Sequence, residues 1–229
     1  MSRMLNQRRH PVALALVAAV TAAVTALLGT GTGGAANTPA SSGGIATSID
    51  PLSEAAARGL LSASQMPKVN EVQRWTRLTE PRTSRITVSQ KGQLAALAPG
   101  HARRDFRMPG GQASNVVLNY RTRAAAVAGY EKVKAWRSNV RAGLPDGAVL
   151  LYRGPHKPVT TPYGSASYFQ FTWKARAAAE EGWFEWVGVT RRGHKVSIVT
   201  WRVGGTDANY DVDPTIASLK AANQALGRV

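Results

Sequence analysis

Two neighbouring segments near the C-terminus, residues 183–190 and 195–203, have the two-residue period of β-strands but are apolar on both faces. The opposed sets are Trp183, Val187 and Val189 against Phe184 and Trp186 in the first segment, and Val196 and Ile198 against Val199, Trp201 and Val203 in the second. Strands of this kind are central strands that need cover on both sides, and helices are the available cover. Arg191-Arg192-Gly193-His194 between them predicts a tight hairpin in which Gly193 takes a positive φ.

The rest of the chain predicts the remaining strands and the covering helices. Further strands are expected at 106–108, 116–120, 148–153 and 167–174, with a short strand at 86–89 and a helical turn at 92–97. Helices are expected from Pro51 through Leu61 after an Asp50 cap, over 122–141, and over 214–226 after an Asp213 cap. The predicted fold class is α/β in the α+β sense, a mainly antiparallel sheet sandwiched between helices. Residues 50–229 should form this single domain.

The N-terminus has the organisation of a secretory signal. Arg8, Arg9 and His10 precede an uncharged apolar stretch from Val12 to Leu28, and a run of small residues follows it. Residues 1–36 are therefore predicted to be a signal peptide, with Ala36 or Ala40 before the cleavage site, and residues 37–49 a flexible Gly/Ser/Thr/Ala linker. An uncleaved leader acting as a membrane anchor is the alternative. Either way the domain is expected outside the cytoplasm, secreted or loosely associated with the cell envelope.

The chain carries 29 Lys and Arg residues against 13 Asp and Glu residues. Three of the arginines precede the apolar stretch, so the mature chain keeps 26 basic residues and a surplus of 13 positive charges. Such a charge attracts anionic partners at long range. Export favours an anionic cell-envelope polymer or a lipid head group and disfavours nucleic acid, and membrane contact is expected only through an uncleaved leader. The alternative is that Ala-rich, Arg-over-Lys usage reflects genome composition, with the charge serving solubility.

No constellation of residues indicates catalysis. The chain has no cysteine, which excludes disulfides, thiol nucleophiles and a lipidated N-terminal cysteine. Its mature histidines, His101, His156 and His194, are scattered and each neighbours a basic residue or segment, so no metal site is predicted. No cofactor is expected.

The acidic residues have ordinary structural interpretations. Asp207, Asp211 and Asp213 are not in the order of a standard calcium loop. Glu180 and Glu181 fall where a connection between two strands is expected, which favours a solvated turn over an acid/base pair.

The order of segments resembles the PknH-like extracellular sensor domain family of actinobacteria. The likeness lies in Leu60–Pro67 after the first helix, Arg104–Arg107 leading into Val116–Tyr120, then Ala126, Tyr130 and Trp136, the 191–194 hairpin, and the closing helix from Pro214. The resemblance implies a PsbP-like α/β/α sandwich and a binding cleft whose natural ligand is generally unknown. Relatives often carry cysteines near Ser89 and Val140, which are absent here.

These observations predict an exported, non-enzymatic ligand-binding or sensor-like domain acting at the bacterial cell envelope. Arg103, Arg104, Arg191 and Arg192, which fall at predicted turns, are the candidate contacts for an anionic ligand. One alternative is a secreted hydrolase whose site assembles only in the fold, with His156 and Glu185 as its members. Another is a structural or interaction protein of the envelope.

Overall fold

The computed structural model describes residues 50–67, 74–80, 82, 84–176, 182–205 and 214–228. The predicted signal, the linker, the Asp213 cap, the Glu180–Glu181 turn and the aspartates at 207, 211 and 213 lie outside these residues. Within the part of the chain that the structure describes, none of the helices has the length and apolarity to cross a membrane.

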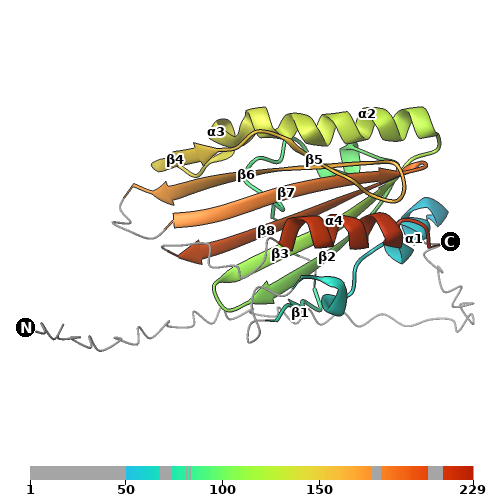
Figure 1. The fold of residues 1–229 in the computed structure, drawn as a ribbon, viewed down its shortest axis with the longest axis horizontal. Helices are drawn as coiled ribbons and strands as arrows, with labels where there is room; N and C mark the ends of the chain where they lie inside the picture. The colour runs from blue at the N-terminus through green and yellow to red at the C-terminus, as the bar shows by residue number, and fades with distance from the viewer. Residues whose placement is uncertain are drawn as a thin grey trace, which may run out of the picture. The chain divides into compact units, whose positions relative to one another are not determined.

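The fold is α+β, as predicted (Figure 1). Its helices are α1 (Pro51–Arg58), α2 (Arg123–Lys134), α3 (Val140–Gly143) and α4 (Pro214–Ala225), with 3₁₀ turns at Ala63–Gln65, Leu94–Ala96 and Ala135–Asn139. Its strands are β1 (Thr76–Arg77), β2 (Gly100–Met108), β3 (Gly111–Asn119), β4 (Ala148–Arg153), β5 (Lys157–Val159), β6 (Ser165–Ala175), β7 (Gly182–Arg192) and β8 (Lys195–Gly205). They form one sheet of eight antiparallel strands in the order β1-β2-β3-β8-β7-β6-β4, with β5 also paired to β6.

Local sequence explains how several elements begin and turn. The Asp50 side chain accepts a hydrogen bond from the Ser53 amide at 3.2 Å, and Pro51 occupies the first position of α1. The Thr122 hydroxyl accepts from the Ala125 amide at 3.1 Å and begins α2. Gly193 turns the β7–β8 hairpin with a φ of 58°, as the sequence predicts.

Helices cover both faces of the sheet, as the two-sided strands require (Figure 1). Val187, Val189, Val196 and Ile198 pack into one hydrophobic cluster with α2, on what we call the α2 face. Trp186, Val199 and Trp201 pack into a second cluster with Leu219, Ala222 and Ala225 of α4. Helix α1 packs through Ala56 against Val117, on the same side as α4. The structure confirms that strands β7 and β8 carry apolar side chains on both faces of the sheet.

Several predicted boundaries are wrong. Residues 86–89 form bends and a turn instead of a strand, and α1 ends at Arg58, followed by Gly59. Strand β2 begins at Gly100 instead of Phe106, so Arg103 and Arg104 lie inside a strand and not at a turn. The short strands β1 and β5 were not predicted. The start of β2 was missed because residues 101–105 are mostly polar and lack the apolar pattern of a strand. They are polar because one face of that strand is not covered by an apolar helix.

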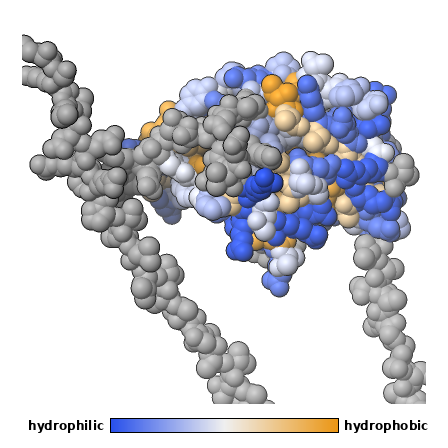
Figure 2. All heavy atoms as spheres, turned by 60° about the horizontal axis from the view of Figure 1, so that its bottom comes forward, coloured by the Kyte–Doolittle hydropathy of each residue, from blue (hydrophilic) through white to orange (hydrophobic). Residues whose placement is uncertain are grey.

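Large exposed apolar side chains are scattered over several elements. They are Val127 on α2, Val149, Leu151 and Tyr152 on β4, Tyr163, and Ile216 on α4. The side of the molecule drawn in Figure 2 is mostly hydrophilic, with small separated hydrophobic areas. Scattered exposure of this kind is normal for a protein surface and does not by itself indicate a partner.

Candidate functional site

The α2 face of the sheet has an apolar part under α2 and a polar part farther along the same strands. Because side chains on one face recur every second residue, the row of Val116 continues into Ser114 and Gln112, and the row of Ile198 continues into Thr200 and Arg202. Segment 84–90 is bound to this polar part, since the Thr200 hydroxyl donates to the Ile86 carbonyl at 3.1 Å.

Glu185 of β7 binds segment 84–90 to the sheet. Its side chain is buried, at 1% exposure, and its carboxylate accepts hydrogen bonds from four donors. These are Thr87 Oγ1 at 2.9 Å, Val88 N at 3.4 Å, Trp173 Nε1 at 2.9 Å and Arg202 Nε at 2.7 Å. A buried carboxylate with this many partners holds neighbouring elements together and has little capacity left for a substrate.

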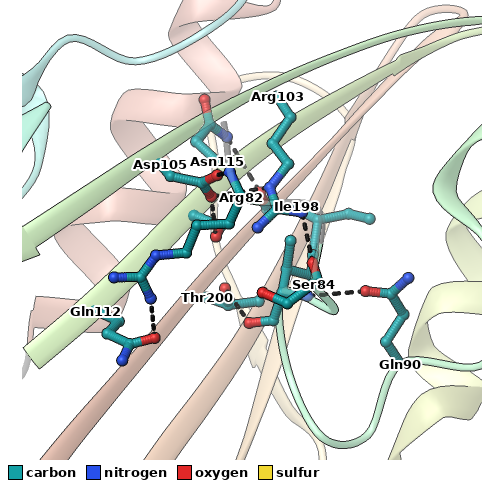
Figure 3. A network of polar contacts seen from close by, with 11 residues as sticks. Arg82, Ser84, Gln90, Arg103, Asp105, Gln112, Asn115, Ile198 and Thr200 are labelled. Carbon is teal, nitrogen blue, oxygen red and sulfur yellow. Dashed lines mark hydrogen bonds and ion pairs between the residues drawn. The ribbon is translucent and has the colours of Figure 1, made fainter. Parts of the chain in front are cut away.

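Asp105 of β2 also holds neighbouring elements together through its carboxylate (Figure 3). It is 2% exposed and accepts from the Arg82 amide at 2.7 Å, from Arg103 Nε at 2.9 Å and from the Ser114 hydroxyl at 2.5 Å. The Arg82 side chain extends to Gln112, to which its Nη1 donates. Asp105 therefore fixes both the backbone at Arg82 and the guanidinium of Arg103.

A cavity of about 320 Å³ lies between strands β2, β3 and β8 on one side and Arg82 and residues 84–88 on the other. We call it the arginine pocket, because the guanidinium-bearing residues Arg82, Arg85, Arg103 and Arg202 line it. Ion pairs with Asp105 and Glu185 compensate Arg103 and Arg202, with N–O distances of 2.9 and 2.7 Å. Four guanidinium groups against two carboxylates leave a local surplus of two positive charges in a concave site.

The ion pairs use only part of the hydrogen-bonding capacity of these arginines. Arg202 is bonded through Nε alone, and Arg103 through Nε and through Nη1, which donates to the Ser84 carbonyl at 2.6 Å. Arg82 is bonded through Nη1, and Arg85 makes no hydrogen bond or ion pair with any other residue that the structure describes. The pocket thus presents N–H donors and positive charge, a combination that suits an anion with several oxygen atoms.

A second cavity, of about 640 Å³, adjoins the arginine pocket and shares Ser84, Arg85 and Arg103 with it. We call it the outer cavity. His101, Gln93 and the residues at the start of the 3₁₀ turn at 94–96 also line it. Gly143 of α3 also lines the arginine pocket and packs so closely on segment 84–90 that a Cβ at this position would overlap the Val88 carbonyl oxygen.

The four arginines predicted as anion contacts do not lie together. Arg103 lines the arginine pocket, but Arg104 points to the opposite face of the sheet, where its Nη1 donates to the Leu61 carbonyl at 2.6 Å. Burial lowers the pKa of Arg104, and the nearby charges of Arg77 and Arg228 lower it further.

The other predicted pair, Arg191 and Arg192, ends strand β7 and does not lie in the turn, which Gly193 and His194 form. Arg191 Nη1 donates to the Gly193 carbonyl at 3.4 Å, and the Arg192 guanidinium lies 3.8 Å from the ring centre of Tyr163. Neither residue lines the arginine pocket or the outer cavity. Ligand contacts at Arg104, Arg191 and Arg192 stay predictions, and the structure does not place these residues in one site with Arg103.

Sequence reasoning missed Arg82, Arg85 and Arg202. Arg202 follows Ile198 and Thr200 at two-residue spacing, so a continued strand pattern places it on the α2 face. Arg82 and Arg85 lie in a segment without periodicity, and no sequence signal connects them with β2 and β8.

The two residues considered for a hydrolase, His156 and Glu185, have separate environments. His156 packs edge-to-face on Phe169 with ring centroids 5.3 Å apart, whereas the Glu185 carboxylate is occupied by its four donors. No hydrogen bond or ion pair joins them in the part of the chain that the structure describes. Nor do the described His, Asp and Glu side chains form a group that could hold a metal ion.

We expect His156 to make stability depend on pH. Burial, with Arg137 as the next cause, lowers its pKa below the ordinary value of 6.5. The unfolded chain therefore binds the proton more readily, and the folded state loses stability as pH falls through about 6.5. Thermal unfolding of the wild type and of His156→Gln, measured from about pH 8 to about pH 5, tests this pH dependence. As the pH falls, the Tm of the wild type should decrease more than the Tm of His156→Gln. A difference in Tm that stays constant with pH contradicts this prediction.

Comparisons with known proteins assign no family. No protein-family model and no curated protein sequence matches the chain. A solved structure from Bacteroides thetaiotaomicron VPI-5482 is similar at 11% identity and a TM-score of 0.30, over 65% of this chain and 40% of that one. The chain thus spans less than half of that protein, and a likeness at this level carries no argument about fold or function.

Proposed function

We propose that this protein is an exported, non-enzymatic binding domain that takes an anionic ligand of the bacterial cell envelope into the arginine pocket. The observation that carries the proposal is the pair of uncompensated guanidinium groups, on Arg82 and Arg85, in a concave site. Positive charges gathered around a concave site attract an anion more strongly than the same charges spread over an open surface.

The chemistry of the pocket favours binding over catalysis. Its two carboxylates, on Asp105 and Glu185, are buried and occupied by donors. The groups left to meet a ligand are arginine N–H donors, which orient and neutralise an anion but do not act as a general base. The resemblance to sensor domains with a binding cleft agrees with this proposal.

The location at the envelope rests on the predicted leader and on the charge of the mature chain. A surplus of 13 positive charges attracts anionic wall polymers and lipid head groups. The dimensions of the pocket suit an anionic end group or a single repeating unit of such a polymer, because a cavity of about 320 Å³ is at the lower end of the range for small-molecule sites.

Salt dependence of anion binding tests the proposal. Pyrophosphate titrated calorimetrically into the purified protein should bind at about 0.1 M salt and lose most of its affinity near 1 M, where the screening length falls from about 10 Å to about 3 Å. Absence of binding, or an affinity independent of salt, contradicts an electrostatic pocket.

A parallel screen with ester, glycoside and peptide substrates tests the claim that the protein is not an enzyme. No turnover is expected. Turnover that His156→Ala abolishes supports the hydrolase and overturns the proposal.

A further inference from the structure

The arginine pocket and the outer cavity are neighbouring cavities that share Ser84, Arg85 and Arg103 in their linings, and we call the two together the cleft. Their other lining residues give the two ends of the cleft different chemistry. The outer cavity, at about 640 Å³, has about twice the volume of the inner pocket, at about 320 Å³. A ligand that fills both ends therefore carries a small charged group and a larger body.

The inner end calls for an anion with more than two oxygen atoms. Of the eight terminal nitrogens of Arg82, Arg85, Arg103 and Arg202, only Nη1 of Arg82 and Nη1 of Arg103 are bonded to other described residues, which leaves six. A carboxylate has two oxygens and matches one guanidinium in bidentate fashion. Phosphate presents three or four oxygens and can meet several guanidinium groups at once.

The outer end is polar but holds no charged side chain beyond the shared arginines among its described lining residues. Gln93 and His101 line it, and neither side chain is hydrogen-bonded to another residue that the structure describes. An amide and an imidazole both donate and accept hydrogen bonds, which is what hydroxyl groups require of a partner. Leu94 and Ala95 add apolar surface for the C–H face of a sugar or polyol.

Hydrogen bonds within the protein hold segment 86–92, which contributes to the lining of both cavities, in place. Ile86 N donates to the Gln90 side chain at 2.9 Å, the Gln90 side chain donates to the Gly92 carbonyl at 2.8 Å, and Asn139 Nδ2 donates to the Ser89 carbonyl at 3.2 Å. With Glu185 holding Thr87 and Val88, the segment from 86 to 92 is connected to the sheet and to the helical region after α2. A prearranged cleft loses less conformational entropy on binding.

We propose that the ligand is a phosphate ester of a hydroxylated body, such as a glycerol or sugar phosphate unit, with its phosphate in the arginine pocket and its hydroxyl groups in the outer cavity. This inference rests on the proposed function and names the ligand class for the same site. The unit occurs both as a soluble metabolite or wall-polymer unit and as a lipid head group, and the shared chemistry is the phosphate joined to a polyol.

Calorimetry with glycerol 3-phosphate, inorganic phosphate and glycerol tests the inference on the purified protein. Glycerol 3-phosphate should bind about tenfold more tightly than phosphate, which is the effect of about two additional neutral hydrogen bonds. Glycerol alone should not bind measurably. The double variant Gln93→Ala/His101→Ala should lower the affinity for the ester to that for phosphate and leave the affinity for phosphate unchanged. The matched control, Gln224→Ala/His194→Ala, removes the same side-chain types outside both cavities and should leave both affinities unchanged.

The outcomes separate this inference from the proposed function. If phosphate and its ester bind equally, or if Gln93→Ala/His101→Ala has no selective effect, the ligand class is wrong while the anion pocket stands. If neither anion binds, both fail. Competition by phosphatidylglycerol vesicles against glycerol 3-phosphate identifies a lipid head group as the source, and competition only by soluble glycerol or sugar phosphates identifies a soluble one; either result supports the shared chemistry.

Discussion

Replacing Glu185 with alanine should lower the free energy of unfolding by about 3–5 kcal/mol, the range for breaking a buried ion pair from one side. The substitution removes the acceptor of three buried donors, Trp173 Nε1, Thr87 Oγ1 and Val88 N, and the ion-pair partner of the partly buried Arg202. Each such group costs free energy when it is desolvated and unpaired. Denaturant unfolding followed by tryptophan fluorescence measures the effect.

Glu131→Ala is the matched control for this prediction. Glu131 also pairs with a basic residue, Lys134, at 2.9 Å, but its side chain is 58% exposed and the pair lies on the surface of α2. Its removal should cost less than about 1 kcal/mol. A loss for Glu185→Ala as small as that for Glu131→Ala contradicts the anchoring role of Glu185.

The double variant Arg82→Gln/Arg85→Gln should weaken the binding of pyrophosphate by at least about 100-fold. Each arginine supplies charge-assisted hydrogen bonds worth about 1.5–3 kcal/mol, and about 1.4 kcal/mol corresponds to a factor of ten in affinity. Stability should change little, because the Arg82 amide that donates to Asp105 is retained and Arg85 is exposed. Calorimetric titration with a thermal-unfolding check on the folded state measures both.

Arg191→Gln/Arg192→Gln is the control matched in charge. It also removes two positive charges, but from the β7–β8 hairpin, outside the arginine pocket. We expect its affinity for pyrophosphate to stay within about threefold of wild type, since neither arginine lines the pocket and salt screens charges at a distance. An equal loss in both double variants shows that overall charge, and not the pocket, governs binding.

The central sheet was predictable because its pattern is dictated by burial. Residues such as Val187, Val196 and Trp201 alternate between two covered faces, and only a central strand satisfies both. The burial of Glu185 was not predicted, although the same pattern indicates it, since Glu185 lies between Trp183 and Val187 on an apolar face and needs partners when buried.

The candidate site was predictable only in part. Arg103 was identified from charge, but its strand was not, because β2 is polar where it faces the cleft. Arg82 and Arg85 come from a segment whose path is set by long-range hydrogen bonds, for example from Arg82 to Asp105 and from Thr200 to Ile86. Local propensity and periodicity contain no information about such contacts.

Nuclear magnetic resonance of the arginine side chains tests most directly whether the arginine pocket is the anion site. In ¹⁵N-labelled protein titrated with glycerol 3-phosphate, the Nε–H signals of Arg82, Arg85, Arg103 and Arg202 should shift together with one dissociation constant. The signals of Arg104, Arg191 and Arg192 should stay in place. Shifts confined to those three residues, or small shifts spread evenly over all arginines, would contradict the account.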